Sequence, residues 1–190
     1  FELVVEYSKE NLTELAIGNF IVKNATNEIA VIENVRYEYT PDEGGKITAS
    51  GRMAISLLDR RIIGSYSGVH PNIITYCANN GNMEAAAMDT VRAFAMTGAA
   101  RAIPNLVLGT PKGYTNKAKK RRSTFQNLYS TLTAFLATKS MAHRIIYDAD
   151  TSQLMYEVFK GTNRSSSMVF SRNLGNLLSF TYERDETDYK

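Results

Sequence analysis

The strongest strand signal in the chain is the stretch Lys46-Ile47-Thr48-Ala49-Ser50-Gly51-Arg52-Met53-Ala54-Ile55-Ser56-Leu57. Its side chains alternate, as they do in a strand that buries one face and exposes the other to water. The face expected to be buried holds Ile47, Ala49, Gly51, Met53, Ile55 and Leu57. Gly51 predicts a bend or a close approach by another backbone, because glycine inside a strand weakens it. The stretch therefore predicts a half-buried antiparallel strand.

Strand signals continue on both sides of this stretch. Ser8 is placed to cap a helix over residues 9–17, which Gly18 would end. Pro41-Asp42-Glu43-Gly44-Gly45 predicts a turn. The other strands are expected at residues 2–7, 20–23, 28–40, with Val35, Tyr37 and Tyr39 on one face, and 62–67. The first third of the chain therefore predicts an antiparallel β-meander.

The middle of the chain has helical spacing. A first helix is expected from Asn82 to Ile103, before Pro104. Its apolar positions are Met88, Val91, Ala95 and Ala102. A second helix is expected from a capping-box pattern, Ser123 with Gln126. Its apolar stripe is Phe125, Leu128, Leu132, Phe135 and Leu136.

After Ser140 the apolar residues again alternate with polar ones, as in a strand. Residues 144–147 and 154–159 flank a turn and predict one hairpin, and residues 168–171 and 177–182 predict another. Strands, two helices and strands in that order indicate an α+β fold that is mainly antiparallel β.

The composition is that of a globular protein, with 190 residues, a net charge of +3 and 44% hydrophobic residues. No apolar run approaches the ~20 residues that span a bilayer, and no signal peptide is visible. The charge is unevenly distributed. Residues 1–59 carry 5 basic and 10 acidic side chains, residues 60–147 carry 12 and 2, and residues 148–190 carry 5 and 7. Such a field can steer a charged partner, or neighbouring copies can neutralise one another's patches.

The sequence offers no catalytic constellation. The two histidines, His70 and His143, lack the spacing of a zinc site. The chain has one cysteine, which excludes a disulfide within the chain. Cys77 lies in an apolar context and is expected to be a small buried side chain rather than a nucleophile. Asp148-Ala149-Asp150 is expected to be a hairpin turn rather than a calcium loop. We therefore expect no enzyme, cofactor or metal.

A run of five cations over residues 117–122 has more than one possible role. Lys117, Lys119, Lys120, Arg121 and Arg122 precede the second expected helix, where positive charge opposes the helix dipole. The run is either a solvated loop or a contact for an acidic protein or for nucleic acid. We assign these five residues as candidate partner-binding residues. No aromatic side chains are interleaved with them, which weakens the case for stacking single-stranded bases.

Several stretches occur in an order that covers nearly the whole chain. They are residues 18–24, 50–52, 57–63, 101–109, 147–150, 156–158, 169–171, 175–179 and 188–190. In these stretches the chain resembles a family of siphophage tail proteins related to the baseplate hub of contractile-tailed phages. That family is also related to the N-terminal part of tail-associated lysins.

The resemblance implies a small β-barrel hub domain with an inserted two-helix and β-hairpin subdomain. Residues 1–68 would begin the barrel, residues 69–172 would form the insertion, and residues 173–190 would return toward the barrel. The chain would then be a fragment of a longer protein at both ends, made in the bacterial cytoplasm and assembled into the virion.

The resemblance also implies a function. Such hubs form trimers at the tail tip, bind the ring of distal tail protein, close the tube and open it for genome ejection, when phage DNA passes. They carry no catalytic residue in this region. Unpaired strand edges in a meander also favour self-association. The alternative is a single-strand nucleic-acid annealing protein of phage recombination, consistent with a strand meander, a helix and a basic middle segment.

Overall fold

The computed structural model describes the chain except for residues 43, 68–69, 73, 77–81, 119–120, 124, 165, 177–178, 180 and 182–190. It divides into two units, Phe1–Lys160 and Gly161–Lys190. The first unit contains, in order, β1 (Glu2–Glu6), α1 (Lys9–Glu14), β2 (Phe20–Lys23), β3 (Glu28–Thr40), β4 (Gly44–Met53), the 3-10 helix η1 (Ala54–Arg60), β5 (Ile62–Ile63), β6 (Ser65–Ser67), β7 (His70–Asn72), β8 (Ile74–Tyr76), α2 (Met83–Ala95), β9 (Leu106–Leu108), β10 (Arg121–Ser123), β11 (Gln126–Asn127), α3 (Leu128–Ala137), β12 (Met141–Asp148) and β13 (Gln153–Lys160). The second unit contains the 3-10 helix η2 (Arg172–Leu174).

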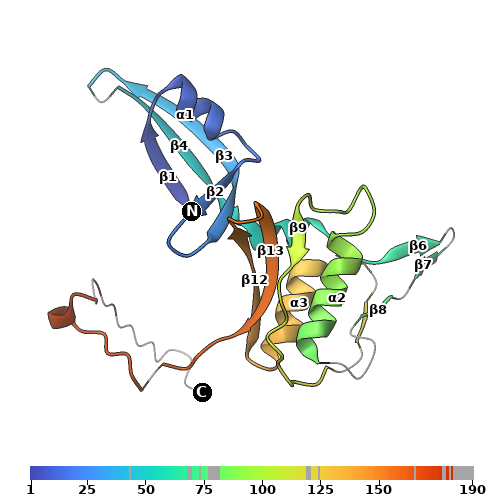
Figure 1. The fold of residues 1–190 in the computed structure, drawn as a ribbon. Coiled ribbons are helices and arrows are strands. Elements are labelled where there is room, and N and C mark those ends of the chain that lie inside the picture. The colour runs from blue at the N-terminus through green and yellow to red at the C-terminus, as the bar shows by residue number, and fades with distance from the viewer. Residues whose placement is uncertain are drawn as a thin grey trace, which may run out of the picture. The chain divides into compact units, whose positions relative to one another are not determined.

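One seven-stranded sheet organises the first unit. Its strand order is β1-β4-β3-β12-β13-β9, and β2 also pairs with β3 (Figure 1). The α+β class dominated by strands is therefore confirmed. The expected barrel is not found, because among the described residues the sheet stays open, with β1 at one end and β9 at the other. The β13–β9 pairing is parallel, and β9 has no alternation long enough to reveal it as a strand in the sequence.

In the N-terminal part of the sheet, the predictions for Ser8 and Gly51 are confirmed. The Ser8 side chain accepts a hydrogen bond from the backbone N–H of Asn11 and so caps α1 as predicted. A bulge between Ile32 and Asn34 leaves Glu33 unpaired opposite Gly51. An added Cβ at Gly51 would lie 1.9 Å from the Val31 carbonyl oxygen. The predicted close approach at Gly51 is thus confirmed, with the bulge as its cause.

The strand predicted up to Leu57 ends earlier. β4 stops at Met53, and Ala54–Arg60 forms η1, which buries Ala54, Ser56 and Leu58. In this 3-10 helix Leu58 is fully buried in the large core. Burial of its apolar side chain stabilises the 3-10 helix over a continued strand. The prediction that residues 62–67 form one strand is also wrong, because β5 and β6 are separate there and pair with different strands.

Helix α2 is shorter than its sequence predicts. It ends at Ala95, and Gly98 adopts a positive φ of 82°, a conformation that favours glycine and cannot continue a helix. Ala102 therefore lies outside the helix. Met88, Val91 and Ala95 are buried as expected.

Helix α3 begins later than predicted. Asn127, not Ser123, caps it, since its side chain accepts a hydrogen bond from the Ser130 N–H at 2.9 Å. Ser123 lies in β10, and Phe125 is 43% exposed, so its assignment to the buried stripe was wrong. Leu128, Leu132, Phe135 and Leu136 form the stripe and are all buried.

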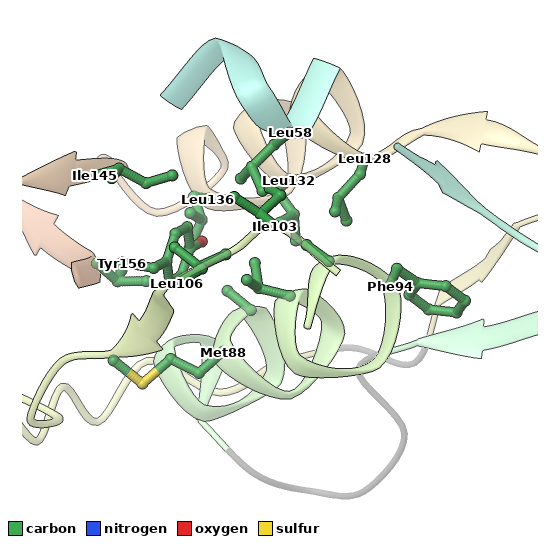
Figure 2. Close-up of a cluster of buried hydrophobic side chains, with 14 of the residues drawn as sticks. Leu58, Met88, Phe94, Ile103, Leu106, Leu128, Leu132, Leu136, Ile145 and Tyr156 are labelled. Atoms are coloured by element: carbon green, nitrogen blue, oxygen red, sulfur yellow. The ribbon is translucent and has the colours of Figure 1, made fainter. Parts of the chain in front are cut away.

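Two hydrophobic cores hold the first unit together. The larger one packs α2, α3 and η1 against β9, β12 and β13 (Figure 2). The smaller one consists of Leu15, Ile32, Ile47 and Ala49 under α1, with Leu3, Val5, Ile21 and Val35 packed against them. No helix in the described part of the chain is long and apolar enough to cross a membrane.

The two predicted hairpins differ in outcome. β12 and β13 pair in full, and the Asp148 carboxylate accepts hydrogen bonds from the Asp150 N–H and the Thr151 hydroxyl in their turn. This confirms the hairpin turn. In the second unit residues 168–171 form no strand, and most of residues 177–182 lie outside the described chain, as does Cys77. The domain boundaries after residues 68 and 172 remain predictions.

Candidate interaction site

A groove of about 560 Å³ opens on the first unit beside the junction of β3 with β12. Most of its walls are apolar, and Arg60 and Arg61 are its only charged lining residues among those described. The lining residues come from β2, β3, η1, the segment before β9, and the β12–β13 hairpin. They are Gly18, Phe20, Val22, Ile29, Leu57, Arg60, Arg61, Ile103, Pro104, Asn105, Tyr147, Ser152 and Leu154.

Backbone contacts fix the far wall of the groove. The Ile103 N–H donates to the Ala95 carbonyl at 2.8 Å, and the Leu154 N–H donates to the Asn105 carbonyl at 2.9 Å. Asn105 and Ser152 both have positive φ angles, 58° and 53°, which turn the chain sharply at this wall. The groove is therefore preformed rather than a gap between loosely packed loops.

Arg61 is held in place without a counter-ion. Its Nε donates to the Arg101 carbonyl oxygen, and its Nη1 donates to the Arg60 carbonyl oxygen at 3.1 Å. Arg101 in turn donates to the Gly64 carbonyl oxygen at 2.9 Å. No carboxylate of the described residues lies within ion-pair distance of Arg61. The groove thus presents a half-buried, oriented guanidinium group that suits an incoming carboxylate.

Arg60 belongs to a charged network above the groove. The Glu33 carboxylate accepts two hydrogen bonds from Arg52, at 2.8 and 2.9 Å, and one from Arg60 at 2.9 Å. Chiefly because of the hydrogen bonds from Arg52, the pKa of Glu33 falls to about 2. Arg52 also contacts Asp59, whose backbone and side-chain oxygens accept from Asn127. The network ties the β3 bulge to η1 and to the start of α3.

The groove gathers stretches that are far apart in the sequence. Residues of 18–24, 57–63, 101–109 and 147–150, four of the stretches that carry the family resemblance, all contribute to its walls. The contact of Glu33 with Arg52 and Arg60 could not be predicted, because the bulge that turns Glu33 toward them has no sequence signature of its own. The β-branched and charged composition of residues 28–40 only predicts a strand.

Of the five candidate cations, the three that the structure describes do not lie at the start of α3. Lys117 is exposed and bridges to Asn82 beside the start of α2. Arg121 and Arg122 lie in β10, which pairs with β8, and Lys119 and Lys120 lie outside the described residues. Because α3 begins at Leu128, the expected conflict with its dipole was wrong. Their role in partner binding remains a prediction.

The segment before this run is anchored by a buried acid that the sequence did not single out. Glu84 is fully buried in α2, and its carboxylate accepts from the backbone N–H groups of Lys112, Gly113 and Tyr114 at 2.6, 2.9 and 3.1 Å. Lys112 also pairs with Glu157 at 2.8 Å. These contacts serve the fold, since each oxygen of the buried Glu84 carboxylate accepts at least one hydrogen bond.

His143 is a satisfied core histidine. Its Nε2 lies 2.9 Å from the Thr133 hydroxyl and its Nδ1 lies 3.2 Å from the Tyr156 hydroxyl. Burial lowers the pKa of His143 to about 4 and raises the pKa of Tyr156. The described residues contain no group of three or more His, Cys, Asp or Glu side chains that could hold a metal ion.

A second surface feature lies at the far end of the β3–β4 hairpin. Tyr7, Tyr37 and Tyr39 share the face that carries the small core but lie beyond it, and they are 44%, 51% and 65% exposed. The Tyr7 and Tyr37 rings lie 4.9 Å apart. We call Tyr37–Asp42, with Tyr7, the aromatic tip. The Asp42 carboxylate has no ion-pair partner in the described part of the chain.

The chain matches a family model over its whole length. The model described as Siphovirus ReqiPepy6 Gp37-like protein matches residues 1–190. No curated protein and no solved structure matches the chain.

Proposed function

Because the chain belongs to the siphovirus Gp37-like protein family, we propose that this phage protein is a structural component of the tail tip. In this role it closes the tail tube, joins the distal tail proteins and opens for genome ejection. The observation that carries the proposal is the match over the whole chain, together with the groove in which four of the resembling stretches meet. Its location is then the virion, and its partners are its own copies, expected as a trimer, and other tail proteins.

The proposal includes the absence of catalysis. His143, the histidine whose side chain the structure describes, is buried, and its two ring nitrogens lie within hydrogen-bond distance of the Thr133 and Tyr156 hydroxyls. The most strongly shifted acid, Glu33, is held ionised by two arginines and has the features of a structural ion pair rather than of a general acid. We therefore expect the purified chain to hydrolyse neither peptidoglycan nor peptides. Cleavage that disappears on substituting one residue pair would contradict this.

Virion analysis tests the proposal. Virions purified through a density gradient and freed of host protein should contain the chain at a few copies per particle, measured by quantitative mass spectrometry. A matched sample of the infected lysate serves as the control. Presence in the lysate with absence from purified virions would contradict the structural role.

The alternative of a single-strand annealing protein rests on the basic middle segment, and salt dependence discriminates the two. An annealing protein would bind single-stranded DNA with an affinity that falls steeply as salt rises, because counterions are released. A tail-tip protein should show weak binding at low salt and none at physiological salt. Replacement of Lys117, Arg121 and Arg122 by Glu should then impair assembly rather than DNA binding.

A further inference from the structure

We propose that the groove receives the aromatic tip of a second copy of this chain. The inference deepens the proposed function and rests on it for one point, that the chain associates with itself. The groove supplies apolar walls and the Arg61 guanidinium, and the aromatic tip supplies exposed tyrosine rings and the Asp42 carboxylate.

The two surfaces are complementary in charge. The groove lining contains two arginines and no acid. The aromatic tip, Tyr37-Glu38-Tyr39-Thr40-Pro41-Asp42, contains Glu38, which pairs with Arg36, and Asp42, which has no ion-pair partner among the described residues. A carboxylate that meets a guanidinium already oriented by two carbonyl oxygens forms a charge-assisted hydrogen bond with little loss of side-chain freedom.

The two surfaces are also complementary in shape and polarity. Tyr39 is 65% exposed, although a tyrosine ring gains most when its apolar body is buried and its hydroxyl stays hydrated. A groove of about 560 Å³ lined by Phe20, Ile103 and Pro104 has room for such a ring. Tyr37 and Tyr39 lie on one face of β3, so both rings reach the same partner.

A chain cannot fill its own groove with its own aromatic tip. β3 begins at the groove, where Ile29 lines it, and runs to Thr40 at the tip. A strand rises ~3.3 Å per residue, so the two surfaces lie roughly 35 Å apart along β3. This strand is paired with β4 along most of its length and cannot fold back. The occupant is therefore another copy, and the contact is head-to-tail, which closes into a ring or continues as a filament.

Photo-crosslinking of the full chain tests the contact. A benzophenone amino acid at position 39 should crosslink to peptides that contain Leu57–Arg61 or Ile103–Asn105. Mixing heavy- and light-isotope chains should show that the crosslinked peptides come from different copies. The matched control is the same probe at position 4, because Val4 is 53% exposed on the opposite face of the sheet.

A charge exchange tests the ion pair. Asp42→Arg should weaken self-association at least tenfold in sedimentation velocity, and Arg61→Glu should do the same. The double variant Asp42→Arg/Arg61→Glu should recover most of the loss, which a folding defect at Arg61 would not allow. Circular dichroism identifies any variant that fails to fold, and Asp42→Arg alone, on an exposed turn, then carries the test.

Several outcomes would overturn the inference. They are crosslinks within one copy, crosslinks only to the Gly161–Lys190 unit, crosslinks only to another tail protein, or a monomer at every concentration with no effect of Asp42→Arg. None of these results depends on whether purified virions contain the chain. Failure of the proposed contact can therefore be distinguished from failure of the proposed function.

Discussion

The two ends of the seven-stranded sheet are stabilised very differently. At the β12–β13 end, α2, α3 and η1 cover the sheet and build a core that contains 22 buried residues among those that the structure describes. At the β1–β4 end, α1 has only 6 residues, none of them buried, and the core has 4. The first region therefore contributes most of the burial that stabilises the fold. The second holds a long hairpin in position and leaves aromatic side chains exposed at its tip.

The largest effect is expected in the large core. Leu132 lies on α3 and is fully buried in the large core, so Leu132→Ala should lower the free energy of unfolding by ~2–5 kcal/mol, measured by urea denaturation. Thr131→Ala, one position along the same helix, should change it little. Equal effects of the two substitutions would show that the helical phase is wrong.

The small core is best tested at its bulge. At Gly51 a methyl group would collide with the Val31 carbonyl oxygen, so Gly51→Ala should force a backbone shift and cost ~1–3 kcal/mol. Gly161→Ala is the matched control, because nothing lies within 4 Å of a Cβ added there. If Gly51→Ala is as stable as the control, β3 and β4 do not pair in this register.

The large core should also respond to acid. The pKa of His143 is about 4 in the folded chain, against 6.5 for the free side chain, because burial disfavours the charged form. The unfolded chain therefore takes up the proton first, and stability falls as pH drops below 6.5. Through this difference in pKa, His143 should lower the free energy of unfolding by about 2 kcal/mol between pH 7 and pH 5.

Comparison with a variant isolates the histidine. The pKa of Glu33 is about 2 in the folded chain, so its contribution to stability declines only as pH falls below the ordinary value of 4.5 and stays nearly constant between pH 7 and pH 5. In His143→Gln the difference in unfolding free energy between pH 7 and pH 5 should shrink. An unchanged difference would mean that another group titrates.

The smallest effect on stability is expected at the aromatic tip. Tyr39→Ser removes an exposed ring that contacts no core residue, so the free energy of unfolding should change by less than about 0.5 kcal/mol. Self-association should nevertheless weaken. A large loss of stability would show that the tip supports the hairpin instead of presenting a surface.

Local patterns predicted the parts of the fold that local forces decide. Composition identified β3 and alternation identified β4, and Ser8 and Gly51 were correctly assigned, because a helix cap and a close backbone approach each favour particular residue types. The failures came where tertiary packing competes with local preference. Leu58 enters the core through a 3-10 helix rather than a strand, and Asn127 replaces Ser123 as a cap because β10 and β11 precede α3.

The groove was less accessible to sequence reasoning than the fold. Its walls come from residues as far apart as Gly18 and Leu154, and only the sheet pairing brings them together. The family resemblance pointed to most of these stretches without showing that they meet. Nothing in the sequence distinguishes Arg60 from Arg61, although Glu33 pairs with Arg60 and no carboxylate of the described residues pairs with Arg61.

Immunogold labelling of intact virions tests the tail-tip role most directly. Antibodies raised against the purified 190-residue chain should be applied to phage particles that encode it and viewed by negative-stain electron microscopy. The account predicts gold at the end of the tail distal to the capsid, lost when the antibody is pre-absorbed with the chain. Labelling along the tail shaft or on the capsid would contradict the tail-tip role. Absence of labelling from both intact and opened particles would contradict it as well.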